Sequence, residues 1–285
     1  MFNQFIAKYK LLSAVSAGLA FVVVVLIILV LRIDQPEPVH TDMTQSKQPA
    51  ELEPVEHKPL PAVNGPIQHG HAVIPNFAEI SNVTARKVEF FQFLLPAAQQ
   101  ENQSILAQRD TLEQLYHNKV LKGIALTEAE SVWLASLSSY YKVNTHDRTR
   151  QFKLLLRRVD VVPETLVLIQ AANESGWGTS RFALEARNFF GQWCWEPGCG
   201  LVPNQRPEGQ SYEVKLFATM EASVRAYIRN LNTHQAYHDL RSIRRHQRLH
   251  DKPIQATALT AGLMNYSTRG EAYIHELQQM IRVNS

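Results

Sequence analysis

The chain has 285 residues, of which 45% are hydrophobic and 19% are charged, and its formal net charge is +3. This composition supplies enough apolar side chains for a core and excludes a wholly disordered chain. The small net charge gives no reason to expect nucleic acid as a partner. The chain has only 2 cysteines, which excludes a disulfide-dense scaffold and a four-thiolate zinc site.

Residues 11–31 form an uncharged, largely apolar run close to the N-terminus. As a helix with a rise of about 1.5 Å per residue, the run spans a hydrocarbon layer of roughly 30 Å. Lys8 and Lys10 precede it, so we expect a cytoplasmic segment at 1–10, a single-pass anchor in the inner membrane at 11–31, and the remainder in the periplasm or envelope. The alternative is a cleaved signal peptide, which has a shorter apolar region and a small-x-small site; Ile33–Pro36 offers no such site.

The next segment is rich in proline. Residues 33–75 hold eight of the 14 prolines of the chain, mixed with serine, threonine, glutamine and acidic residues. Proline fixes φ and lacks an amide donor, so regular helix or sheet is not expected. We therefore predict an extended, flexible tether at 32–75.

Apolar residues at three- to four-residue spacing predict helices from Asn82 onward. The first stripe is interrupted at Pro96 and resumes after it. Thr127 and Glu130 form a capping-box pattern that begins a second helix, and a third covers about 148–158. No catalytic pattern falls in this part, and we predict a helical support region at 76–145.

A further apolar helix begins near Pro163 and ends at Gly176, which places Glu174 in its last turn. The negative end of the helix dipole and an apolar wall from Trp177 would both disfavour the carboxylate and raise its pKa. A carboxyl group that stays protonated near neutral pH suits general-acid catalysis at a glycosidic oxygen. The alternative is an ordinary solvated glutamate near a helix end.

Four motifs follow one another in the C-terminal half of the chain. The first, Ala171–Ser180, contains Glu-Ser-Gly-Trp-Gly. The others are Asn-Phe-Phe-Gly at 188–191, the segment Phe217–Tyr227, and a terminal Tyr-Ser-Thr-Arg-Gly-Glu-Ala-Tyr motif at 266–273. In this order they resemble the glucosaminidase domain, glycoside hydrolase family 73. The terminal motif departs from the family pattern, because Arg269 stands where the family has aspartate and one residue is added.

A longer pattern is similar to the Bax-like subgroup of bacterial envelope proteins, over roughly residues 80–285. It includes Phe90 and Phe91, Asn173 in place of the more usual leucine, and the segments Gly191–Cys194 and Cys199–Pro203.

The resemblance implies a mainly α (α+β) fold: a lysozyme-like helical domain with a small β-lobe at 146–285. It also implies an endo-β-N-acetylglucosaminidase that cleaves the β-1,4 bond after N-acetylglucosamine in peptidoglycan glycan strands, without a cofactor. Glu174 would then be the general acid, and Tyr266 would position substrate or water.

A second carboxylate would stabilise positive charge or activate water, and the family has it in the β-lobe. Residues 200–206 and 212–217 are predicted strands, joined by a turn at 207–210. Glu208 at the tip of that turn is our first candidate, before Glu213 and Glu196. Glu174 acting alone, or together with the acetamido group of the substrate, is the alternative.

Flat apolar side chains suit the faces of sugar rings, so we place three aromatic residues near the cleft, Trp177, Phe190 and Trp193, although core packing is an equal alternative. Tyr273 of the terminal motif and Glu213 are grouped with them as substrate-binding candidates. Cys194 and Cys199 flank a turn composition and are disulfide candidates in an oxidising compartment.

Two further clusters carry weaker signals. The histidine pairs 234/238 and 246/250 have i, i+4 spacing but lack the glutamate of a His-Glu-x-x-His motif, so no metal site is predicted. A basic cluster at 241–252 is either a solvated face or a surface that attracts peptidoglycan carboxylates or anionic lipid.

Three rival functions stay open. A lytic transglycosylase shares the Glu-Ser start of the first motif. A wall amidase would need metal ligands, which the sequence does not assemble. A non-catalytic wall-binding protein could use the same fold. The sequence assigns no protein partner.

Overall fold

The computed structural model describes residues 59–67 and 70–284, and Pro59–Asn284 form one compact unit. The predicted segments 1–10 and 11–31 and the tether up to residue 58 lie outside the described residues. Within the described part of the chain, no helix combines the length and apolar character that a bilayer crossing requires. In chain order the elements are η1 (Phe77–Glu79), α2 (Val83–Asn118), η2 (Val120–Lys122), α3 (Glu128–Tyr140), α4 (Arg148–Arg158), α5 (Glu164–Ser175), α6 (Arg181–Ala186), β1 (Trp193–Cys194), β2 (Gly200–Leu201), β3 (Glu213–Lys215), α7 (Met220–Thr233), η3 (Gln235–Tyr237), α8 (His238–Leu249), α9 (Ala256–Leu259), η4 (Thr260–Leu263) and α10 (Glu271–Asn284).

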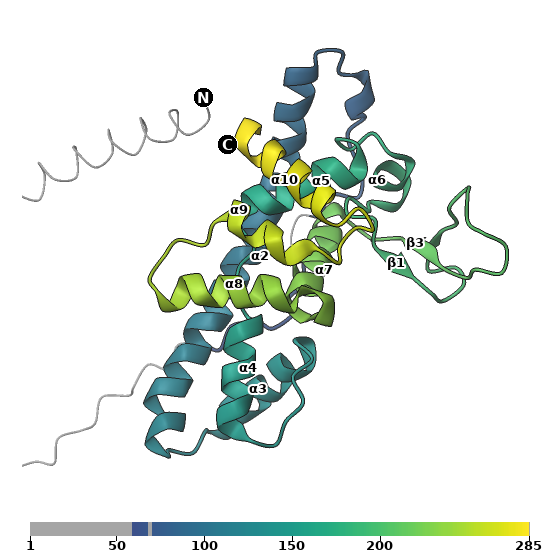
Figure 1. Cartoon of the computed structure of the whole chain (residues 1–285). Coiled ribbons are helices and arrows are strands. Elements are labelled where there is room, and N and C mark those ends of the chain that lie inside the picture. Colours follow the sequence, from purple (N-terminus) through teal and green to yellow (C-terminus); the bar gives the residue numbers. More distant parts are fainter. Residues whose placement is uncertain (1–58, 68–69, 285) are drawn as a thin grey trace, which may run out of the picture. The chain divides into compact units, whose positions relative to one another are not determined.

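Helix α2 is the longest element, with 36 residues, and α4, α5 and α7 pack along it (Figure 1). The predicted interruption at Pro96 is wrong, because one helix runs through that position. A proline in a helix interior costs about 3 kcal/mol. Pro96 lies on the exposed side of α2, whereas Leu94, Ala98 and Ile105 are buried in the core. Burial of that apolar face offsets the cost of the missing hydrogen bond.

The other predicted helix starts are confirmed. Thr127 accepts from the amide of Glu130, whose carboxylate accepts from the amide of Thr127, so the capping box at α3 is complete. The predicted helix at 148–158 is α4, with Asp147 as its N-cap. Helix α5 begins after Pro163 and ends at Gly176, whose backbone is left-handed, as expected. Helix α5 contacts α2 and α10.

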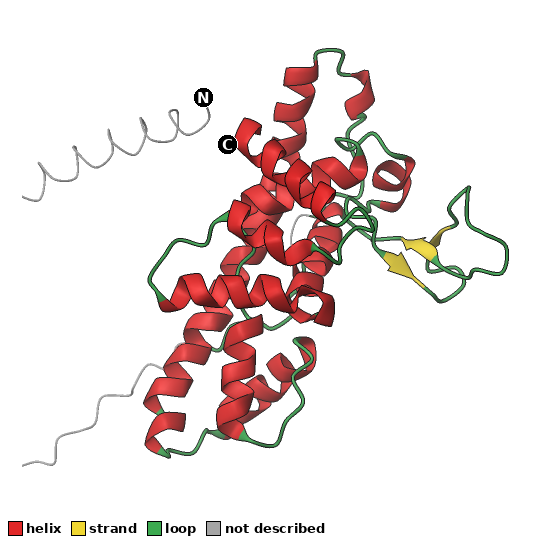
Figure 2. Ribbon diagram, in the orientation of Figure 1, coloured by secondary structure: helices red, strands yellow, loops and turns green. Residues whose placement is uncertain are grey.

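The strands form a small three-stranded antiparallel sheet in the order β1-β3-β2 (Figure 2). Strand β1 was not predicted, and β2 and β3 are shorter than the strands expected at 200–206 and 212–217. Pro203 lacks the amide that would continue the ladder from β2, and residues 202–212 instead form a long excursion. The mainly helical class with a small β-lobe is confirmed, whereas the lysozyme-like topology stays a prediction.

Residues 59–67 and 70–75 pack against the helices, which differs from the extended tether expected there. The carbonyl of Pro61 accepts from Nε1 of Trp133 at 2.7 Å, and that of Gly65 accepts from Nη1 of Arg225 at 2.7 Å. The carbonyl of His71 accepts from the amide of Met220 at 2.9 Å. A proline-rich segment has free carbonyls, so side chains and a helix N-terminus satisfy them in place of a strand partner.

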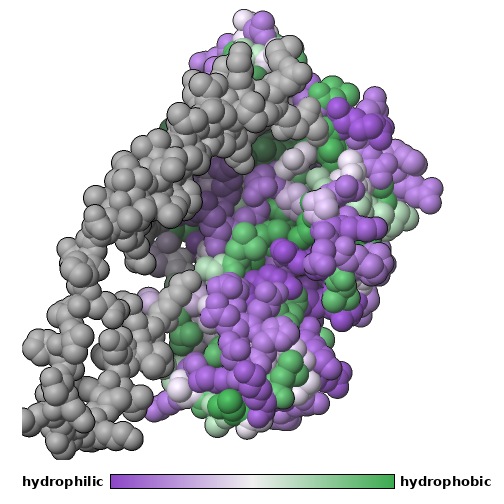
Figure 3. Space-filling view, turned by 90° about the vertical axis from the view of Figure 1, so that its left-hand side faces the viewer, coloured by the Kyte–Doolittle hydropathy of each residue, from purple (hydrophilic) through white to green (hydrophobic). Residues whose placement is uncertain are grey.

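The basic cluster on α8 is not a uniformly solvated face. Arg241 and Arg244 are buried, and both donate to backbone carbonyls: Arg241 to Leu231 and Arg244 to Val161, each at 2.8 Å. Arg245 and Lys252 are exposed. On the face shown in Figure 3, hydrophilic residues predominate and hydrophobic residues form small separate patches.

Candidate active site

Three successive left-handed residues follow the last turn of α5, where Glu174 lies. Gly176, Trp177 and Gly178 have φ values of +58°, +58° and +75°. A Cβ atom at position 178 would lie 2.5 Å from Cδ2 of Phe77, so only glycine fits there. A left-handed backbone is unfavourable for a bulky residue such as Trp177, and such strain concentrates at functional sites.

Trp177 packs its half-buried ring against α2. Its ring centroid lies 5.8 Å from that of Phe90 and 5.3 Å from that of Phe91. The Nζ atom of Lys87 lies 4.7 Å from the Trp177 ring centroid, a cation–π geometry. These contacts orient the ring and hold the turn after Glu174 against the long helix.

The carboxyl group of Glu174 is half-buried and accepts a hydrogen bond from the Tyr273 hydroxyl at 2.7 Å. Burial raises the pKa of Glu174, and the negative charge of Glu276 raises it further. The side chains of Tyr273, Asn173 and Arg269 lower it. The net shift of the pKa is upward. The neutral acid therefore persists to a higher pH than for a solvated glutamate. This agrees with the direction expected from the sequence, although desolvation is the leading cause.

Two tyrosines of the terminal motif lie beside this carboxyl group. The rings of Tyr266 and Tyr273 stack with centroids 5.6 Å apart and an interplanar angle of 4°. The Tyr266 hydroxyl donates to the carbonyl of Phe190 at 3.0 Å and is therefore not the hydroxyl bonded to Glu174. Tyr273, grouped from the sequence with the substrate-binding residues, makes that contact instead.

A cavity of about 370 Å³ lies beside the end of α5 and is bounded by α2, α5 and α10. Asn173, Trp177 and Glu276 are among its lining residues. Its volume is within the range of small-molecule sites, about 300–1,000 Å³. Asn173 and Trp177, which flank Glu174 in the sequence, thus line one cavity, and Glu276 lies on its α10 side.

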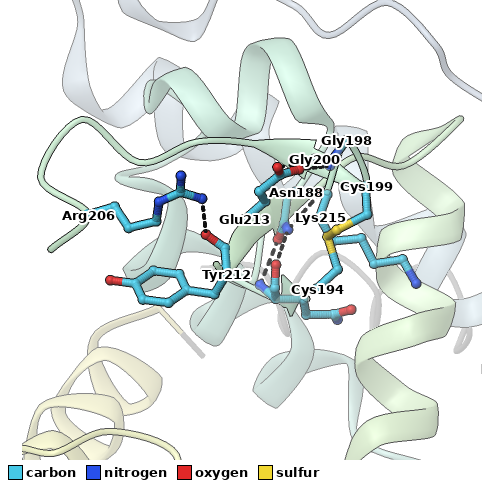
Figure 4. Close-up of a disulfide and its surroundings, with 10 residues drawn as sticks. Asn188, Cys194, Gly198, Cys199, Gly200, Arg206, Tyr212, Glu213 and Lys215 are labelled. Carbon is cyan, nitrogen blue, oxygen red and sulfur yellow. Dashed lines mark hydrogen bonds between the residues drawn. A yellow bond between two sulfur atoms is a disulfide. The ribbon is translucent and has the colours of Figure 1, made fainter. Parts of the chain in front are cut away.

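The β-lobe uses Glu213 for its own structure (Figure 4). Glu213 is 6% exposed, and its carboxylate accepts from the amides of Gly198 at 3.0 Å and Gly200 at 2.8 Å. These amide donors hold the pKa of Glu213 below its ordinary value. Cys194 and Cys199 form a disulfide that closes the same turn. Glu213 therefore anchors the disulfide loop, and the substrate-binding role expected for it stays a prediction.

The same group of atoms does not fit a metal ion. Ligand atoms of Cys194, Cys199 and Glu213 lie within 4.8 Å of one another. A disulfide leaves no thiolate for a metal, and the carboxylate oxygens are occupied by backbone amides.

The remaining candidates in the lobe are exposed. Glu208 lies in the excursion between β2 and β3 and makes no hydrogen bond or ion pair with any residue of 59–67 and 70–284. Glu196 is exposed in the disulfide turn. Trp193 is 52% exposed, and its ring stacks on that of Tyr212 with centroids 4.5 Å apart. One face of the Trp193 ring is therefore covered within the lobe.

Phe190 belongs to the core wall of the site. It is 3% exposed, and its ring stacks on Tyr227 at a centroid distance of 4.0 Å, which leaves no face for a sugar. Gln170 and Tyr227 were not singled out from the sequence, yet both lie in the hydrogen-bond network behind Glu174. In the sequence, Gln170 could have been noticed as the one polar residue of the stretch 166–172, one turn before Glu174.

The site combines a half-buried acidic group at a helix end, tyrosines beside it and a small β-lobe in the same unit. The model of the Glucosaminidase family, described as mannosyl-glycoprotein endo-beta-N-acetylglucosaminidase, matches residues 149–285, which include Glu174, Tyr266 and Tyr273. Residues 149–285 are therefore a domain of glycosidase type.

A particular relative extends the similarity beyond that domain. The chain is 35% identical to "Protein bax" of Escherichia coli (strain K12) over 213 residues, which is 74% of this chain and 74% of that protein. The chain therefore belongs to the Bax-like proteins with a Glucosaminidase domain, and the assignment made from the sequence is confirmed. No solved structure gives a significant match to the chain.

Proposed function

We propose that this protein is a peptidoglycan hydrolase, an endo-β-N-acetylglucosaminidase that cleaves the β-1,4 bond after N-acetylglucosamine. The observation that carries the proposal is the Glu174 carboxyl group, which is half-buried at the end of α5, bonded to Tyr273 and shifted toward its neutral form. Membership of the Glucosaminidase family supports the sugar and the bond.

In the proposed reaction, Glu174 donates its proton to the glycosidic oxygen while the bond from that oxygen to the anomeric carbon breaks. The leaving sugar keeps the bonding electron pair and the new proton. The resulting Glu174 carboxylate is stabilised by the donor hydroxyl of Tyr273. Tyr266, stacked on Tyr273, holds that ring in place.

The second step needs a water molecule that attacks the oxocarbenium-like carbon and a group that removes its proton. Glu213 is already bonded to two backbone amides in its own lobe, so we do not assign it this role. We propose Glu208, because its carboxylate is exposed on a long excursion and has no partner in the described part of the chain. The acetamido group of the substrate is the alternative.

Product analysis tests the proposed function. Peptidoglycan is digested with the full chain and with Glu174→Gln, and the fragments are identified by mass spectrometry. We expect new reducing N-acetylglucosamine ends from the parent chain alone. Ends with a 1,6-anhydro sugar would assign a lytic transglycosylase, released stem peptides would assign an amidase, and binding without any cleavage would assign a wall-binding protein.

We further propose that residues 11–31 anchor the chain in the inner membrane and that the domain works in the periplasm or envelope. The support is the length of the uncharged run and the lysines before it. We expect the full chain to sediment with membranes and a chain that begins at residue 33 to be released. A full chain found in the soluble fraction would contradict the anchor.

A further inference from the structure

A buried amide lies directly behind the acidic group. Gln170 is on α5, one turn before Glu174, and its side chain is 0% exposed. Its Nε2 atom donates to the Tyr273 hydroxyl at 2.9 Å, and that hydroxyl donates to Oε1 of Glu174 at 2.7 Å. On its other side, Oε1 of Gln170 accepts from the hydroxyl of Tyr227. The four side chains form one continuous chain of hydrogen bonds.

Tyr227, the member of the chain farthest from Glu174, determines the donor and acceptor direction of these hydrogen bonds. Tyr227 is 1% exposed, and Gln170 is the only hydrogen-bond partner of its hydroxyl in residues 59–67 and 70–284. A buried hydroxyl proton without an acceptor costs about 1–3 kcal/mol, so it points to Gln170 Oε1. The amide is then oriented with Nε2 toward Tyr273.

The same reasoning applies at the next step. The Tyr273 oxygen accepts from Gln170, so its own proton must go to another acceptor. Tyr273 is 2% exposed, and the acceptor that it contacts is Glu174. Asn173 lowers the pKa of both Tyr273 and Glu174, which is the effect of a donor to either group.

We propose that Tyr227 and Gln170 are positioning residues that fix the hydroxyl of Tyr273 as a donor to Oε1 of Glu174, so that the transferable proton is carried by Oε2. The proposal deepens the proposed function of Glu174 and rests on it for its catalytic meaning. An oxygen that accepts a strong hydrogen bond is the poorer site for the proton, so the acid is presented from one defined oxygen.

This arrangement assists the reaction on both sides of proton transfer. Before transfer, the proton sits on Oε2, the carboxyl oxygen that Tyr273 does not contact, and is available to the reacting oxygen. During transfer the O–H bond on Oε2 breaks and a new O–H bond forms on the leaving sugar. Afterwards Tyr273 already donates to the carboxylate, so no hydroxyl rotation is needed. Cooperative polarisation along Tyr227 and Gln170 strengthens that last donor.

Other groups act on Glu174 without belonging to the chain. Glu276 on α10 and Arg269 before α10 face it electrostatically, and they pair with each other at 2.8 Å. The rings of Tyr266 and Tyr237 also lie near it. The hydroxyl of Tyr237 bonds Asn230, and Tyr237 is buried, which makes it a matched control.

The test compares Tyr227→Phe, Gln170→Met and Tyr237→Phe in the full chain. The readout is the pKa of the Glu174 carboxyl group, measured by carbon NMR on side-chain-labelled glutamate, with the signal assigned by its loss in Glu174→Gln. Each phenylalanine variant keeps its ring, so the stack of residue 227 on Phe190 is retained. We expect Tyr227→Phe and Gln170→Met to raise the Glu174 pKa by about half to one unit, because donation to the carboxylate weakens.

Tyr237→Phe should leave the Glu174 pKa unchanged. If the folded Tyr227→Phe variant keeps the parent pKa, or if Tyr237→Phe shifts it equally, the proposed chain is overturned and Tyr227 has only a packing role. The pH profile of hydrolysis provides a second readout, whose basic limb should move upward with the pKa. An inactive parent chain would overturn the proposed function alone, since the titration reports the hydrogen-bond chain without substrate.

Discussion

Replacing Glu174 with glutamine should lower the rate of peptidoglycan cleavage by about 10²–10⁴-fold while the fold stays intact. A general acid contributes typically about 10²–10⁴-fold, and an amide cannot supply the proton. Glutamine matches the shape of the side chain, and its amide oxygen can still accept from Tyr273. The measurement is the rate of appearance of reducing sugar ends, together with the thermal midpoint of each variant.

Glu185→Gln is the matched control, because Glu185 is exposed on α6 and its only ion pair within the described residues is with Arg181 at 3.1 Å. Its activity should equal that of the parent. A Glu174→Gln chain that cleaves within tenfold of the parent would refute the assignment of the acid. Glu208→Gln in the same assay separates the two mechanisms for the second step: a loss of similar size supports Glu208, and near-parent activity assigns the step to the acetamido group.

The pH dependence follows from the same group. Glu174 acts as an acid only while it is protonated, and burial raises its pKa. The cleavage rate should therefore fall as the pH increases through that raised pKa, giving a basic limb above the range of an ordinary glutamate, about 4.3.

Asp160→Asn should destabilise the folded unit by about 3–5 kcal/mol, because it removes the charge from a buried ionic cluster. Asp160 is 2% exposed. Its carboxylate lies 2.6 Å from Arg248, 3.4 Å from Arg109 and 3.6 Å from Arg244. Arg244 is fully buried, and burial lowers its pKa to about 10. Without the anion, these guanidinium groups repel one another in a site with little water.

The free energy of unfolding is measured with urea, and Asp239→Asn serves as the control because Asp239 is exposed. We expect the control to stay within about 0.5 kcal/mol of the parent. A loss of less than about 1 kcal/mol in Asp160→Asn would show that the arginines are adequately held by their backbone acceptors alone.

The pH dependence of this stability has a defined sign. Burial favours the neutral form of Asp160, but Arg244, Arg248 and Arg109 outweigh it and lower the pKa of Asp160 below its ordinary value. The contribution is therefore complete above the unfolded-state pKa of about 4 and is lost as the pH falls through the lower, folded-state pKa. The stability gap between the parent chain and Asp160→Asn should narrow below about pH 4.

Much of the helical framework could be predicted from local patterns. The capping box at Thr127, the helix at 148–158 and the left-handed stop at Gly176 depend on residues within one turn of each other, so short stretches of sequence determine them. Local patterns do not predict the continuation of α2 through Pro96, because it depends on packing of α2 against distant helices. They do not predict the short strands either, because these depend on pairing across the β-lobe.

The sequence by itself determined the family, the position of Glu174 at a helix end and the upward direction of its pKa. Only the tertiary structure decided which residues surround that carboxyl group. Tyr273 and Tyr227 lie 99 and 53 residues from Glu174 in the chain. Glu213, a candidate second carboxylate from the sequence, instead accepts from a backbone amide of the β-lobe. Asp160 forms ion pairs with three arginines that are distant from it in the sequence. Local geometry and motif order are properties of neighbouring residues, whereas hydrogen-bond partners and desolvation arise only when distant segments pack together.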